Sequence, residues 1–149
     1  MTSAKKQLGD WGEQLVAKTC PCPRCKNSKT FKLLPPNFKC ADLICDFCGF
    51  LAQVKTTSVP DSQQLPSTIL GAAWKPQKER MDAAIYLPLY VVLKGEGARD
   101  RSIYYLSADL QLPDMFKPRK PLSQSAKRAG WQGFVYDLTA AEGRIVKVF

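Results

Sequence analysis

The chain has 149 residues, of which 45% are hydrophobic and 23% charged, as expected for a single globular domain with a sizeable core. Its 22 basic and 13 acidic residues give a formal charge of +9, which favours polyanionic partners, nucleic acid first and an acidic membrane surface second; a basic, solvated surface is the plainer alternative. Histidine is absent, which excludes triads, zinc hydrolases and nucleases that depend on imidazole, so a hydrolase with this sequence would rely on carboxylates, lysine and metal.

The sequence shows no segment suited to a membrane or to export. The apolar run at residues 83–93 contains a proline and is shorter than the roughly 20 residues of a membrane helix. The first residues lack the apolar core of a secretory signal. We therefore expect a cytoplasmic protein.

The N-terminal segment predicts a helix over residues 3–19, capped by Thr2 or Ser3 and ended by two following prolines. Its apolar stripe is formed by Leu8, Trp11, Leu15 and Val16. Glu13 lies on the flank of that stripe.

Later segments predict strands and a second helix. Strands are expected at residues 30–34, 40–45, 49–57, 133–138 and 144–149, with a hairpin over residues 85–107. Residues 61–78 are polar and turn-prone, and a second helix is predicted over residues 72–84 despite Pro76. The order of elements predicts an α/β fold with a mixed β-sheet flanked by helices.

The six cysteines are Cys20, Cys22, Cys25, Cys40, Cys45 and Cys48. Four of them form two C-x-x-C pairs, and Cys45 follows Cys25 by 20 positions, which is within the spacing of structural zinc sites. We predict that Cys22, Cys25, Cys45 and Cys48 bind Zn²⁺ within a knuckle spanning residues 20–48.

Disulfides or a redox C-x-x-C are the alternatives, but nothing signals an oxidising compartment and a redox motif does not explain two matched pairs. A closed four-thiolate site has no open position for water, so this metal is expected to be structural. Cys20 and Cys40 are interpreted as partly buried thiols, with Cys20 as a second choice of ligand in place of Cys22.

An acid and a Gln-x-Lys pair lie next to the second cysteine pair. Gln53 follows Asp42 by 11 positions, and on a strand Gln53 and Lys55 point to one face while Val54 turns inward. Asp42, the Gln53 side chain and the Val54 carbonyl offer the hard oxygen ligands that Mg²⁺ prefers. Lys55 would orient the attacking water and stabilise charge on a phosphate. Taken alone, these residues also fit a solvated strand face, and Glu13 is the candidate for a further carboxylate.

The order of motifs carries a resemblance. Glu13 in the first helix is followed by Cys22-Pro23-Arg24-Cys25, Ala41-Asp42, Cys45-Asp46-Phe47-Cys48 and Gln53-Val54-Lys55. This succession, together with residues 119–138 and the closing segment 143–149, resembles the catalytic domain of the DpnI-like (Dam-replacing) restriction endonucleases.

The resemblance implies a nuclease domain of the PD-(D/E)XK type with a Cys₄ zinc site, acting as a type II restriction-like deoxyribonuclease on methylated DNA. It implies catalytic Mg²⁺ at Asp42, Gln53 and Val54, with Lys55 and Glu13 in the active site. Two features depart from the family pattern. Gln53 stands where the family usually has glutamate, and residues 1–149 are expected to form a single nuclease domain without the C-terminal winged helix, so recognition of methyladenine in a GATC-like site does not follow directly.

The basic segment 116–131 is the candidate DNA contact. Phosphate neutralisation needs clustered cations, and an adjacent aromatic ring can stack on a base. The candidate residues are Arg119, Lys120, Lys127, Arg128 and Trp131. The alternative is that Trp131 anchors the core and the cations are solvated.

Three functions are consistent with these observations. The first is a Mg²⁺-dependent DNA endonuclease of restriction type acting on double-stranded DNA, as a homodimer or with a separate DNA-reading subunit. The second is a non-catalytic, zinc-stabilised DNA-binding module. The third is a structure-selective repair or resolvase nuclease of the same fold.

Overall fold

The computed structural model describes residues 3–36, 38 and 41–149, and the chain divides into two compact units. Unit 1 comprises Met1–Leu65, Leu87–Ala108 and Ile145–Phe149. Unit 2 comprises Pro66–Tyr86 and Asp109–Arg144. Among the described residues, no helix is long and apolar enough to cross a membrane.

Unit 1 begins with helix α1, Ala4–Thr19, which confirms the helix predicted over residues 3–19. Ser3 is the N-cap, and its side chain accepts a hydrogen bond from the backbone N–H of Lys6 at 3.1 Å. The helix ends where the backbone of Cys20 becomes extended. The capping residue and the first turn therefore agree with the sequence pattern.

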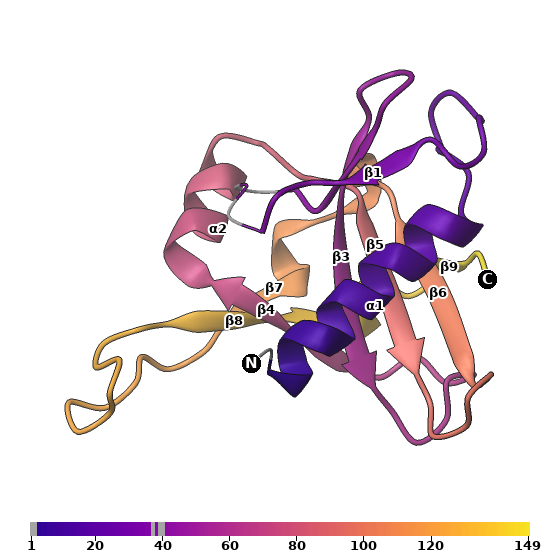
Figure 1. The fold of residues 1–149 in the computed structure, drawn as a ribbon. Helices are drawn as coiled ribbons and strands as arrows, with labels where there is room; N and C mark the ends of the chain where they lie inside the picture. The colour runs from indigo at the N-terminus through magenta and orange to yellow at the C-terminus, as the bar shows by residue number, and fades with distance from the viewer. Residues whose placement is uncertain (1–2, 37, 39–40) are drawn as a thin grey trace. The chain divides into compact units, whose positions relative to one another are not determined.

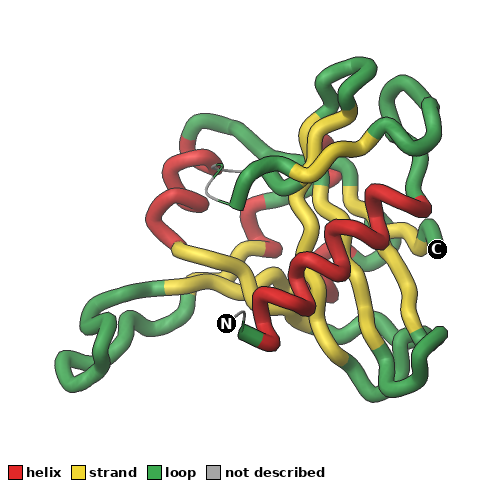
Figure 2. The backbone as a smooth tube through the Cα atoms, in the orientation of Figure 1, coloured by secondary structure: helices red, strands yellow, loops and turns green. Residues whose placement is uncertain are grey.

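A six-stranded mixed sheet forms the rest of unit 1 (Figure 2). Its strands, in spatial order, are β1 (Phe31–Leu33), β2 (Leu43–Cys45), β3 (Leu51–Ser58), β5 (Leu89–Lys94), β6 (Arg101–Leu106) and β9 (Val146–Lys147). β3 and β5 are parallel, and the other neighbouring strands are antiparallel. The mixed sheet and the hairpin predicted over residues 85–107 are thus confirmed.

Helix α1 crosses one face of this sheet, over β3 and β5 (Figure 1). Val16 is fully buried against a core that includes Phe31, Val54 and Tyr90. Burial raises the pKa of the Tyr90 hydroxyl above its ordinary value. The helix is therefore fixed to the central strands by apolar packing, which also fixes the side chains along its edge.

Unit 2 contains a three-stranded antiparallel sheet of β4 (Thr68–Ala73), β8 (Gly133–Asp137) and β7 (Phe116–Pro118), in that order. The rings of Phe116, Phe134 and Tyr136 pack against one another at tilted angles in this sheet. Helix α2, Trp74–Asp82, follows β4 directly. Short 3₁₀ turns occur at Ala108–Leu110 (η1), Pro113–Met115 (η2) and Leu138–Ala141 (η3).

The second helix was predicted over residues 72–84 and is confirmed. Pro76 is tolerated because it lies in the first turn, where backbone N–H groups have no partner within the helix. The expectation of turns throughout residues 61–78 is wrong in part, because residues 68–73 form strand β4. Only Ile69 of that strand is buried, so its alternation was too weak to detect.

Candidate functional site: a four-thiolate cluster and an acidic cleft

The four predicted zinc ligands lie together in unit 1. The Sγ atoms of Cys22, Cys25, Cys45 and Cys48 all lie within 4.8 Å of one another. Cys22 Sγ is 3.6 Å from Cys48 Sγ, and Cys25 Sγ is 3.7 Å from Cys45 Sγ. Tetrahedral Zn²⁺ with Zn–S bonds of about 2.3 Å places its sulfur ligands about 3.8 Å apart. The sulfur spacing fits a structural zinc ion.

Two turns of the same design supply these thiols. In the first turn, the N–H of Lys26 donates to the Cys22 carbonyl at 2.9 Å. In the second, the N–H of Gly49 donates to the Cys45 carbonyl at 2.8 Å. Both Lys26 and Gly49 have positive φ, at 67° and 81°. Each C-x-x-C turn therefore closes on a residue in the left-handed region, which directs both of its sulfurs to one point.

Neighbouring polar groups support the sulfurs. Thr30 Oγ1 lies 3.1 Å from Cys45 Sγ, and the Asn27 amide donates to Cys25 Sγ at 3.5 Å. The Arg24 guanidinium donates to the Cys48 carbonyl at 2.7 Å. Such contacts orient metal ligands and stabilise thiolate charge.

The pKa values of the thiols differ within the cluster. Burial acts to raise the pKa of Cys45, but hydrogen bonds from Thr30 and from backbone N–H groups outweigh it and lower that pKa to about 6. The neighbouring Arg24 side chain lowers the pKa of Cys48. Burial raises the pKa of Cys22 to about 11. The second turn thus favours thiolates, the form that binds metal.

Cys20 is buried but lies outside this cluster. Cys22, and not its suggested substitute Cys20, therefore belongs to the predicted zinc site. Burial raises the pKa of the Cys20 thiol. The prediction for Cys40 lies outside the described residues.

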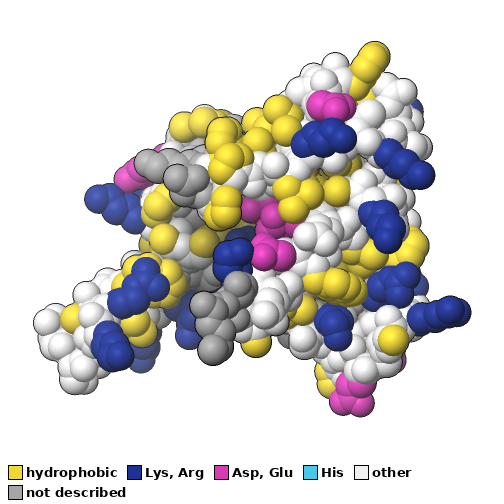
Figure 3. Space-filling view, viewed as in Figure 1, with side chains coloured by type: hydrophobic (Ala, Val, Ile, Leu, Met, Phe, Trp, Pro, Cys, Tyr) yellow, Lys and Arg dark blue, Asp and Glu magenta, His cyan; other side chains and the backbone are white. Residues whose placement is uncertain are grey.

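Unit 1 also contains an acidic cleft, next to the start of β2. The cleft has a volume of about 440 Å³ and is lined by α1, by the segment that follows β1 and by Asp42. Acidic side chains gather beside α1 on this face of the molecule (Figure 3). Lys6, Asp10 and Glu13 of α1 line it together, since positions three and four apart share a helix face.

Asp42 is held against β3. Its backbone N–H donates to the Ala52 carbonyl at 2.9 Å, and its carboxylate Oδ2 accepts from the N–H of Val54 at 2.8 Å. In the β2–β3 register Leu43 pairs with Ala52, so Asp42 lies opposite Gln53. The Asp42 carboxylate is therefore held beside Val54, between Gln53 and Lys55 in the order of β3.

Gln53 and Lys55 alternate along β3 with the buried Ala52 and Val54. Both are half-buried, as the predicted strand geometry requires. They pair in parallel register with Leu89 and Val91 of β5. The central position of β3 holds this part of the backbone rigid.

Glu13 reaches the cleft from α1. Its pKa is raised from 4.5 to about 7, first by burial and then by the negative charges of Asp42 and Asp10, while Lys6 and Lys55 act to lower it. Its carboxyl group is thus electrostatically coupled to Asp42. Two acids from different elements share one partly desolvated site, a common arrangement at catalytic centres.

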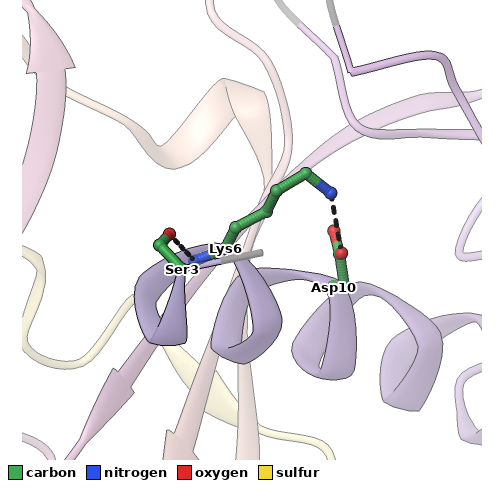
Figure 4. Close-up of polar contacts among 3 residues, drawn as sticks. All are labelled: Ser3, Lys6 and Asp10. Carbon is green, nitrogen blue, oxygen red and sulfur yellow. Dashed lines mark hydrogen bonds and ion pairs between the residues drawn. The ribbon is translucent and has the colours of Figure 1, made fainter. Parts of the chain in front are cut away.

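Two features near the cleft were not predicted. Lys6 and Asp10 form an ion pair at 3.0 Å along the helix edge, next to the Ser3 cap (Figure 4). Gly12 is buried against Thr56 of β3, where a Cβ atom would collide with the threonine side chain. Gly12 lies on the same face of the helix as Leu8 and Val16, four residues away on either side. A glycine within this apolar stripe could have indicated from the sequence that the helix approaches a strand closely.

The predicted DNA-contacting residues lie in unit 2, in the connection between β7 and β8. The Arg128 guanidinium lies over the Trp131 ring, 4.5 Å from its centre. Trp131 also packs against Gly133 at the start of β8. Arg119, Lys120 and Lys127 are exposed.

The mixed sheet and the four-thiolate cluster define an α/β protein with a knuckle suited to a metal ion. A protein-family model described as DpnI, Dam-replacing family, matches residues 2–148, and the chain belongs to that family. Membership indicates a restriction-type nuclease role with DNA as the partner. A comparison with curated proteins found no match.

Proposed function

We propose that this protein is a Mg²⁺-dependent DNA endonuclease of restriction type, built on the PD-(D/E)XK fold. The observation that carries the proposal is the placement of the Asp42 carboxylate, which accepts from the Val54 N–H on the strand that bears Gln53 and Lys55. The coupling of Glu13 to the charges of Asp42 and Lys55 supports a shared site.

The donor atoms suit a hard cation. Asp42, the Gln53 side-chain oxygen and the Val54 carbonyl would hold Mg²⁺, with Glu13 as a further carboxylate. The ion, when bound, stabilises charge on the phosphate and lowers the pKa of water. A carboxylate has two oxygens, so Asp42 can accept from Val54 and still offer a ligand atom.

Lys55 has the remaining role at the reacting phosphate. Its ammonium group would orient the attacking water and stabilise the developing negative charge. The Val54 N–H keeps the Asp42 carboxylate aligned, so that the ligands do not reorganise when substrate binds.

DNA binding is assigned to the basic connection of unit 2. Arg119, Lys120, Lys127 and Arg128 would neutralise phosphates, and Trp131 would hold Arg128 in place through its ring face. We propose that residues 1–149 act as one nuclease domain in the cytoplasm. Its substrate is double-stranded DNA, with adenine-methylated GATC-like sites as the first to be tested, cut by a homodimer or with a separate DNA-reading subunit.

Gln53 favours a second candidate function, a non-catalytic DNA-binding module. Replacing an acid by an amide removes one negative charge from a site that must attract Mg²⁺. A structure-selective nuclease with the same residues would differ in its substrate rather than in its chemistry.

The test is cleavage of Dam-methylated, unmethylated and branched DNA in Mg²⁺ or Mn²⁺. We expect cleavage by the wild-type protein, and a loss of at least about 100-fold in Lys55→Ala, since a group that stabilises transition-state charge is typically worth this much. Lys18→Ala, at the exposed end of α1, is the matched control. Zinc content and melting temperature are measured for each variant. Binding without cleavage of any of these substrates would support the DNA-binding module instead.

A further inference from the structure

The thiolate knuckle has an exposed surface that its metal-binding role does not require. Phe47, between the two cysteines of the second turn, is 71% exposed. Arg24, Lys26 and Lys29 are also exposed on the first turn and the segment after it. Basic side chains are visible at this end of unit 1, on the face that carries the acidic cleft (Figure 3). An exposed aromatic ring among cations is a typical surface for nucleic acid.

The two turns allow an internal comparison. Lys26 and Gly49 occupy equivalent positions, because each follows the second cysteine and donates to the carbonyl of the first. Cys22 and Cys45 correspond in the same way, since their N–H groups donate to Asn27 and Phe50, each five residues later. The second turn uses glycine at the left-handed position, whereas the first has lysine.

Lysine is not the residue that the backbone favours there. Left-handed backbone costs a residue with a Cβ atom about 1 kcal/mol relative to glycine. Lys29 is in the same region, with φ of 60°, so two of the three described non-glycine residues with positive φ are lysines of this segment. The backbone conformation therefore gives no reason for lysine at positions 26 and 29, and we look for that reason in the lysine side chains.

We propose that Lys26, Lys29 and Phe47 form a second DNA-contacting surface, the knuckle surface, which binds duplex DNA beside the acidic cleft. The lysines contact phosphates, and Phe47 packs against a deoxyribose or base edge. This inference deepens the proposed function and rests on it only in taking DNA as the partner.

The spacing of the two sites suits one duplex. Asp42 precedes β2 and Cys45 ends it, so about 10 Å of strand separates the cleft from the second turn. That length corresponds to the rise of about three base pairs. A duplex with a phosphate at the cleft would therefore bring flanking phosphates to the knuckle surface.

Another explanation for the lysines is local charge balance. Four thiolates around Zn²⁺ leave a net negative charge, which nearby cations stabilise. Arg24 already contacts the cluster through the Cys48 carbonyl and lies over the Phe50 ring. Under that explanation, removing Lys26 and Lys29 weakens zinc binding and leaves DNA binding unchanged.

The test is Lys26→Gly combined with Lys29→Gly, with binding to a short duplex measured by fluorescence anisotropy over a salt series, without Mg²⁺. Glycine relieves the left-handed backbone, so zinc content and melting temperature should stay the same or rise. The slope of log K against log salt should fall in magnitude by about 2, one unit for each lost phosphate contact. Phe47→Ser should weaken binding roughly three- to tenfold and leave the slope unchanged, because no counterion is released by an aromatic ring.

Lys26→Arg combined with Lys29→Arg keeps both charges and should retain the wild-type slope. Lys75→Gln with Lys147→Gln removes two exposed charges elsewhere and should change the slope by clearly less. An unchanged slope in the glycine variant, or a loss of zinc with no loss of binding, would overturn the inference. Because binding is measured without Mg²⁺, a failure of cleavage would disprove the proposed nuclease and leave the knuckle surface standing.

Discussion

The thiolate cluster and the acidic cleft lie at opposite ends of strand β2, yet they are built in different ways. The cluster takes its ligands from two local turns that repeat one design, so each C-x-x-C pair assembles within six residues. The cleft takes its carboxylates from α1 and from Asp42, the residue before β2, whose side chain accepts a hydrogen bond from Val54 of β3. Each turn can bring two of the four thiols together through local hydrogen bonds alone. The cleft, in contrast, forms only after the helix has packed on the sheet.

This difference predicts a one-way dependence. The cluster joins the segment after α1 to the connection between β2 and β3, so it supports the strands on which the cleft is built. The cleft residues have no such role in the cluster. Changes at the cluster should therefore disrupt both sites, and changes at the cleft should leave the bound zinc intact.

The largest effect is expected from loss of a cluster thiolate. Cys45→Ser should abolish stoichiometric zinc and unfold unit 1, since structural zinc contributes on the order of 10 kcal/mol to small domains. Zinc analysis and circular dichroism measure the two outcomes. Cys20→Ala is the control, because Cys20 is also buried yet lies outside the cluster. A Cys45→Ser protein that lacks zinc but melts at the wild-type temperature would show that the cluster does not support the fold.

The same difference explains what could be predicted from the sequence. The cysteine spacing identified all four clustered thiols, and the pattern of residues 3–19 identified α1, with Thr2 or Ser3 as its cap, of which Ser3 is the one observed. Strand β4 and the unit it belongs to were not predicted, because β4 has one buried side chain and depends on pairing with β8. The coupling of Glu13 to Asp42 could only be guessed, since it depends on how closely α1 approaches β3.

That close approach is the next feature to test. Gly12→Ala places a Cβ atom against the Thr56 side chain and should destabilise the protein by about 1–3 kcal/mol, the usual cost of overpacking. Zinc content should not change, because the cluster lies beyond the end of the helix. Gly9→Ala, in the same helix and with open space around it, should instead stabilise by up to about 1 kcal/mol.

Thr56→Ala should restore stability to the Gly12→Ala variant, because it removes the colliding atoms. The Thr56 hydroxyl is buried without a hydrogen-bond partner among the described residues, so its loss alone should cost little. A double-mutant cycle from urea unfolding measures the coupling. Additive effects in that cycle would mean that α1 does not depend on this contact.

The smallest expected effect is electrostatic and concerns the cleft alone. The pKa of Glu13 is about 7 in the folded, metal-free protein and 4.5 without the cleft, raised first by burial and then by Asp42 and Asp10. The folded state therefore binds the proton more tightly, and its stability falls as the pH rises from about 4.5 to about 7. Since Glu13 is partly exposed, solvent screening limits this loss to about 1 kcal/mol.

Glu13→Gln should remove that part of the pH dependence and gain stability relative to wild type near neutral pH, while Glu96→Gln should behave as wild type. Urea unfolding at mildly acidic and mildly alkaline pH measures the difference. Parallel pH profiles for Glu13→Gln and wild type would mean that Glu13 and Asp42 do not share a desolvated site. The cleft would then not be a functional site to set beside the thiolate cluster.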